Sequence, residues 1–206
     1  MTVDIFEDSI FSKGYKDIPT SAWYPSYPEF EHPKEFIDWV NSINSGWQNK
    51  IEYKPFDLYC KQAEEWLKDE SDITDFDTVE GQTNWLFQEA RRCKDNSLYF
   101  CNKYGYIKED KAPDGSGRLK YKAWDAQRVL LFLFDSGYST MIGKARQIGF
   151  TTTMCLAGMK RVNFNKSYFI KFVTHSDKKG QEIFKDKVKW AYAQVPDHIA
   201  QEVKNW

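Results

Sequence analysis

The stretch from residue 139 to residue 194 constrains the fold of this 206-residue chain more than any other feature, because strand-like and helix-like patterns alternate along it. A short segment bounded by turn residues, Ser139–Ala145, predicts a strand, and Tyr168–Val173 is rich in the aromatic and β-branched residues typical of a second one. The periodicity of Thr151–Val162 and of Asp177–Gln194 predicts a helix after each strand. Such alternation favours a parallel sheet, so we expect an α/β fold with flanking helices.

The charge distribution indicates a different region before this stretch. Residues 1–90 hold 7 basic and 19 acidic residues, residues 91–140 hold 10 and 6, and residues 141–206 hold 12 and 5. We therefore expect an acidic, aromatic-rich and mainly helical region over residues 1–94, and the α/β region over residues 95–206. Other predicted elements are a helix from Pro33 onward, helices near Asp57–Lys68, Thr83–Cys93 and Asp125–Asp135, and a hairpin over Tyr104–Lys122.

The composition excludes several classes of protein. A chain that is 41% hydrophobic and 17% aromatic can bury a core, which excludes wholesale disorder. No apolar run approaches the roughly 20 residues that span a bilayer, and the N-terminus lacks the cationic segment of a secretory signal, so we expect a soluble intracellular protein without membrane partners. Four cysteines without CxxC spacing and three scattered histidines predict free thiols and no zinc site.

The segment KARQIGFTT, residues 144–152, lies between the first predicted strand and its helix. A phosphate-binding loop needs N–H groups at a helix N-terminus, a glycine for the turn, a cation, and a hydroxyl for Mg²⁺. Gly149 and Thr151 stand where the usual pattern has its second glycine and its hydroxyl, whereas Lys144 replaces the first glycine and Phe150 the usual lysine. Because the loop curls around phosphate, Lys144 or Arg146 can reach the same oxygens. The segment predicts a phosphate loop; the alternative is an ordinary turn beside solvated cations.

A glutamine upstream of the loop strengthens this prediction. Gln127 precedes Gly149 by 22 positions and lies in the predicted helix Asp125–Asp135. Its amide holds both a donor and an acceptor, which suits the edge of adenine, and the neighbouring Trp124 would shield the base. The two features together predict ATP as the ligand.

Tyr99-Phe100, Trp124–Gln127 and Lys144–Thr152 together resemble the start of the ATPase domain of terminase large subunits from tailed bacteriophages. The resemblance covers about residues 95–200 and implies a P-loop NTPase-type parallel sheet. It implies that Gln127 contacts adenine, that Lys144 or Arg146 is the catalytic cation on the phosphates, and that the Thr151 hydroxyl binds Mg²⁺. The other residues that it places at the nucleotide are Trp124, Gln147, Ile148, Gly149, Phe150 and Thr152.

The resemblance also implies a biological role. Terminase large subunits couple ATP hydrolysis to the packaging of double-stranded DNA into procapsids in the host cytoplasm. They act with a portal and a small terminase subunit, form a ring oligomer when full length, and carry a separate nuclease domain. In such an assembly the basic stretch Lys178–Lys189 would lie near DNA. The alternative is that these lysines are solvated on one face of a helix.

No acidic pair of the kind that binds the metal and activates water follows Thr152 in the sequence. The apolar run Val129–Asp135 ends in an acid but precedes the loop and has helical periodicity, and Asp177 is expected as a cap or first-turn acid. We therefore expect a P-loop domain truncated before its hydrolytic motif, with little or no turnover. Two alternatives stay open: a non-catalytic binding or assembly module with a vestigial loop, and another P-loop ATPase such as a helicase-like protein.

Overall fold

The computed structural model describes residues 34, 35, 38, 41, 42, 53–109, 116–137 and 149–201. The chain divides into two units, one of Met1–Asp57 with Met141–Ile148 and one of Leu58–Thr140 with Gly149–Trp206. The described residues of the first unit are 34, 35, 38, 41, 42 and 53–57, and all of them are helical. Most of the described residues belong to the second unit, which holds the candidate site.

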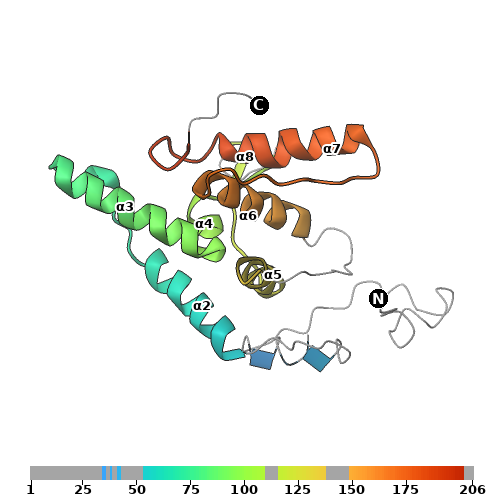
Figure 1. Cartoon of the computed structure of the whole chain (residues 1–206), viewed down its shortest axis with the longest axis horizontal. Helices are drawn as coiled ribbons and strands as arrows, with labels where there is room; N and C mark the ends of the chain where they lie inside the picture. Colours follow the sequence, from blue (N-terminus) through green and yellow to red (C-terminus); the bar gives the residue numbers. More distant parts are fainter. Residues whose placement is uncertain are drawn as a thin grey trace. The chain divides into compact units, whose positions relative to one another are not determined.

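The described elements are mainly helices (Figure 1). In chain order they are α2 (Tyr53–Leu67), η2 (Ile73–Asp75), α3 (Val79–Asp95), α4 (Ser97–Tyr104), β1 (Tyr106–Lys108), β2 (Arg118–Lys120), α5 (Asp125–Asp135), α6 (Phe150–Phe164), α7 (Asp177–Ile183), the π-helical η3 (Phe184–Lys189) and α8 (Trp190–Tyr192). Side-chain caps begin several of them: Thr78 accepts from Gly81 N, Asn96 from Tyr99 N and Ser176 from Lys179 N. Of the helices predicted from periodicity, α3 and α7 have such caps, whereas α5 and α6 have no side-chain capping hydrogen bond, so caps alone do not set the observed bounds.

Helix α6 lies at the centre of the second unit. It packs on α3, α4 and α5 and, on its other side, on η3 (Figure 1). Cys155, Leu156 and Ala157 on successive positions are all completely buried, which indicates that neighbours surround the helix rather than cover one face. Helix α4 is buried to a similar degree through Leu98 and Phe100. The core therefore forms around the helix that begins at the predicted phosphate loop.

The sheet of the described residues is a single antiparallel hairpin. β1 pairs with β2 in the register Tyr106↔Lys120, Ile107↔Leu119 and Lys108↔Arg118. This confirms the hairpin expected over residues 104–122, whose loop at 110–115 lies outside the described residues. The hairpin also contains a cation–π contact, in which Lys120 Nζ lies 4.4 Å from the centroid of the Tyr106 ring.

The parallel sheet expected from the alternating pattern is not present among the described residues. Tyr168–Val173 is not assigned as a strand and has no ladder partner there, although Ile170 and Phe172 alternate toward Gly158 of α6 as they would in one. A strand requires a hydrogen-bonded neighbour as well as a suitable composition. The first predicted strand, Ser139–Ala145, lies outside the described residues. The described residues are mainly helical, with a small antiparallel sheet.

Three further expectations concern the chain as a whole. Cys60, Cys93, Cys101 and Cys155 are free and buried, which confirms the prediction of unpaired thiols. No helix in the described ranges has the length and apolarity required to cross a membrane. The division into regions 1–94 and 95–206 stays a prediction.

Candidate functional site

The predicted loop enters helix α6 through a glycine in the left-handed conformation. Gly149 is the N-cap, with φ 74° and ψ 1°, and it gives α6 no side-chain capping hydrogen bond. The first intrahelical bond runs from Thr153 N to Gly149 O, at 3.0 Å. The N–H groups of the first turn are therefore not bonded by a capping side chain, which is the arrangement that favours an anion at a helix N-terminus.

Gln127 packs directly against this glycine. Its side chain is only 5% exposed, and a Cβ placed on Gly149 would lie 2.6 Å from Gln127 Nε2. Gln127 Oε1 accepts hydrogen bonds from Tyr121 Oη at 3.0 Å and from Trp124 N at 3.2 Å. The structure thus brings together the glutamine and the loop glycine that the sequence analysis paired across 22 positions. The role of Gln127 as an adenine contact stays a prediction.

A buried tyrosine joins Gln127 to the first turn of α6. Tyr121 Oη lies 2.8 Å from Thr153 Oγ1, which in turn lies 3.2 Å from the carbonyl oxygen of Gly149. Burial, reinforced by Cys101, raises the pKa of Tyr121 well above its ordinary value. The hydroxyl donates to Gln127, because the amide oxygen Oε1 can only accept. With Tyr121 Oη donating to Gln127, the single proton of the Thr153 hydroxyl goes either to Tyr121 Oη or to Gly149 O, so two of these three hydrogen bonds exist at a time. The buried Tyr121 hydroxyl thus holds Gln127 beside the first turn of α6.

The other predicted nucleotide residues divide into those that are placed and those that are not. Trp124 begins α5 as its N-cap and leaves 63% of its surface exposed. In the first turn of α6, Thr151 is exposed, Phe150 is half-buried and Thr152 is 9% exposed. Lys144, Arg146, Gln147 and Ile148 lie outside the described residues. The structure therefore brings Gln127 to Gly149 at the start of α6, and Trp124 bonds to Gln127 through its backbone N–H.

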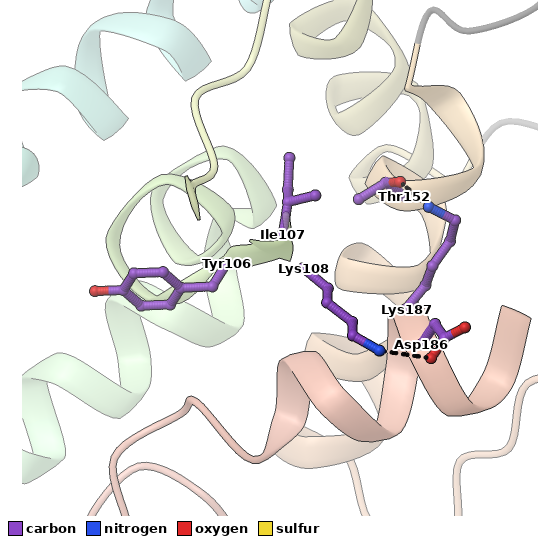
Figure 2. Close-up of a pocket in the computed structure, with 6 residues that line it drawn as sticks. All are labelled: Tyr106, Ile107, Lys108, Thr152, Asp186 and Lys187. Carbon is purple, nitrogen blue, oxygen red and sulfur yellow. Dashed lines mark hydrogen bonds and ion pairs between the residues drawn. The ribbon is translucent and has the colours of Figure 1, made fainter. Parts of the chain in front are cut away.

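A pocket of about 230 Å³ lies beside the first turn of α6. Its lining comes from three elements and consists of Tyr106, Ile107, Lys108, Thr152, Asp186 and Lys187 (Figure 2). Lys187 Nζ donates to Thr152 Oγ1 at 2.9 Å, and Lys108 Nζ pairs with Asp186 Oδ1 at 3.4 Å. Sequence reasoning missed the approach of Lys187 to α6 and treated the surrounding lysines as a surface for DNA or as the solvated face of a helix. Nothing local in the sequence singles out Lys187 from the lysines around it.

A second polar cluster, around Glu89, is buried between α3 and α4. Glu89 is 1% exposed and accepts hydrogen bonds from the hydroxyls of Tyr99 and Tyr104, both at 2.8 Å. Lys103 Nζ lies 3.3 Å from Glu89 Oε1. Burial first, and then the charge of Glu89, raise the pKa of both tyrosines far above their ordinary values. Because three donor groups surround this buried carboxylate where α3 and α4 pack together, we interpret the cluster as one that stabilises the fold. The sequence analysis did not predict it.

Asp135, which ends the apolar run of α5, also has a structural setting. It accepts from Ser97 N, from Ser97 Oγ at 2.7 Å, from Tyr59 Oη at 2.9 Å and from the buried Lys160 at 3.1 Å. Burial lowers the pKa of Lys160, and the charge of Asp135 opposes that shift. These contacts agree with the expectation that residues 129–135 form a packing helix. Asp177 lies in the first turn of α7, as expected, with Ser176 as the cap.

No group of three or more histidine, cysteine, aspartate or glutamate residues in the described ranges is arranged to hold a metal ion. The assignment of the Thr151 hydroxyl to Mg²⁺, which the resemblance implies, stays a prediction. Comparison of the chain with protein-family models, with curated proteins and with solved structures gives no significant match.

Proposed function

We propose that this chain binds ATP with Mg²⁺ at the start of α6, as the front part of a packaging ATPase of the terminase type. The observation that supports the proposal most is the contact of Gln127 with Gly149, at the N-terminus of a buried helix that lacks a side-chain cap. A phosphate loop requires this kind of turn, and Gln127, the proposed adenine contact, packs on it.

Each part of the nucleotide has a counterpart among the proposed residues. The exposed indole of Trp124 stacks on the base beside Gln127. The first turn of α6 donates its backbone N–H groups to phosphate oxygens, and Lys144 or Arg146 supplies positive charge from the preceding loop. The exposed Thr151 hydroxyl is a ligand of Mg²⁺.

The wider role rests on the resemblance described above. In this proposal the ATPase drives double-stranded DNA into a procapsid, with a portal, a small terminase subunit and a ring of copies as partners. The described residues contribute no acidic metal cluster, and the sequence holds no acidic pair after Thr152. Purified chain should therefore bind nucleotide with little hydrolysis, which a phosphate-release assay with and without DNA can measure.

The binding claim is tested by titration calorimetry and thermal shift with a slowly hydrolysed ATP analogue and Mg²⁺. A ligand that binds only the native state raises the midpoint of thermal unfolding. Trp124→Ala should weaken binding, because it removes the stacking surface while leaving the backbone N–H that bonds to Gln127. Phe87→Ala is the matched control, because Phe87 is similarly exposed, at 72%, but lies on α3. No shift at millimolar analogue, or equal losses in the two variants, would overturn the proposal.

A binding or assembly module is the second candidate, and one observation favours it. Phe169 and Val173 are 84% and 83% exposed on an extended segment without a ladder partner among the described residues. Exposed apolar side chains on an unpaired extended segment are typical of surfaces that take a partner strand. A chain that binds no nucleotide analogue at all would favour this reading.

A further inference from the structure

The pocket beside α6 gathers charge from three elements that are distant in the sequence. Lys108 comes from β1, Thr152 from the first turn of α6, and Asp186 with Lys187 from η3 (Figure 2). Lys108 and Asp186 pair with each other, and both remain about half exposed. Two lysines face one carboxylate, so the lining as a whole is positive.

Lys187 supplies the unbalanced charge. Its ammonium group donates to the neutral hydroxyl of Thr152 at 2.9 Å, and within the described ranges it forms no ion pair with a carboxylate. An ammonium group held against a hydroxyl keeps donors and charge for an anion that enters the pocket. Figure 2 shows the side chain reaching from η3 across the pocket to the first turn of α6.

The backbone of η3 has an uncommon form at this point. Residues Phe184–Lys189 make a π-helical turn inside an otherwise continuous α-helical stretch. Such turns are rare and occur frequently at functional sites, because the wider turn changes the direction in which following side chains point. Both η3 residues of the pocket, Asp186 and Lys187, lie within it.

We propose that this pocket, which meets α6 at Thr152, binds phosphate groups of the nucleotide that extend past the first turn of the helix, with Lys187 as a direct phosphate ligand. The inference rests on the proposed function, and it adds a residue that lies 35 positions beyond Thr152. The volume of about 230 Å³ is below the roughly 300–1,000 Å³ of sites that enclose whole small molecules. The pocket therefore suits phosphate groups, and the base and sugar would lie outside it.

Lysine acylation mapped by mass spectrometry tests this on the unmodified protein. Lys187 should react more slowly when inorganic tripolyphosphate or the ATP analogue is present, because a bound phosphate covers its ammonium group. Lys185 is the internal control, because it lies on the same π-helical turn and is exposed. Protection of neither lysine, or of both to the same degree, would overturn the inference.

Lys187→Gln and Lys185→Gln then form a matched pair of variants, because each removes one positive charge from η3. Calorimetry should give a loss of about tenfold or more in affinity for tripolyphosphate in Lys187→Gln, the size expected for one charge-assisted hydrogen bond. Lys185→Gln should change affinity by much less. Equal losses in both variants would indicate general electrostatic attraction and would refute a direct contact.

The two ligands separate this inference from the proposed function. If Lys187→Gln binds the ATP analogue as tightly as the unmodified protein does, the role of Lys187 is refuted and ATP remains the proposed ligand. Binding of tripolyphosphate that depends on Lys187, together with no preference for the ATP analogue, would keep the phosphate pocket and refute adenine nucleotide as its source. Absence of binding to either ligand in the unmodified protein would refute both.

Discussion

The contact between Gly149 and Gln127 can be tested by substituting the glycine. In Gly149→Ala, a residue with a Cβ would have to adopt φ 74°, which costs about 1–2 kcal/mol for a residue other than glycine. The new Cβ would also lie 2.6 Å from Gln127 Nε2, so one of the two groups must move. We therefore expect two separable penalties, one from the backbone conformation and one from the contact.

The second penalty follows from what holds Gln127 in place. Its Oε1 accepts from Tyr121 Oη and from Trp124 N, and its side chain is buried. Moving the amide away from Gly149 weakens both bonds, at about 1 kcal/mol each. Gly137→Ala is the matched control, because Gly137 has φ 76° and nothing within 4 Å of an added Cβ. Gly149→Ala should thus destabilise the fold by about 2 kcal/mol more than Gly137→Ala does.

Urea unfolding followed by circular dichroism measures the free energy of unfolding of each variant. The cycle is completed with Gln127→Ala, which removes the side chain that the new Cβ would meet. In that background Gly149→Ala should cost no more than Gly137→Ala, which gives a coupling energy of about 2 kcal/mol. Equal destabilisation by the two glycine substitutions in the unmodified background would refute the packing of Gln127 on the loop glycine.

Three further predictions concern stability, pH and thiol reactivity. Glu89→Ala should lower the free energy of unfolding by about 3–5 kcal/mol, because it leaves buried donors and a lysine without their carboxylate; a loss below about 1 kcal/mol in urea unfolding would contradict this. Hydrogen bonds from Ser71 and then from Arg92 lower the pKa of Asp69 to about 2, from its ordinary value of 3.8. A lowered folded-state pKa stabilises the fold above pH 3.8 and ceases to do so as pH falls through about 2, so unfolding curves of Asp69→Asn and unmodified protein should differ most near neutral pH and converge in acid; a constant difference would argue against it. Burial raises the pKa of Cys155 to about 11, so a disulfide reagent such as DTNB should label the native thiols slowly and the urea-unfolded thiols at once; rapid labelling of the native protein would show that the thiols are accessible.

Much of the secondary structure was predictable because its signals are local. The apolar periodicity of residues 125–135 predicted α5 with the bounds that the structure gives, and the hairpin followed from two short strand patterns around a turn-rich loop. Residues 168–173 have a composition that suits a strand but form no ladder with the described residues, and the other strand predicted for the sheet, Ser139–Ala145, lies outside those residues. Pairing depends on a neighbour that composition does not specify.

Some features of the candidate site were likewise predictable from local sequence, whereas others depend on tertiary packing. The sequence by itself singled out Gly149, Thr151 and Gln127, because glycine, hydroxyl and amide at those positions each have a chemical use that can be read from residue type and spacing. Only the tertiary structure placed Gln127 Nε2 against Gly149, joined Tyr121 to Thr153, and brought Lys187 to Thr152. Those contacts join residues 22 to 35 positions apart on different elements. They form because α5, α6 and η3 pack together, and the distances between side chains are set by that packing rather than by any pattern within one segment.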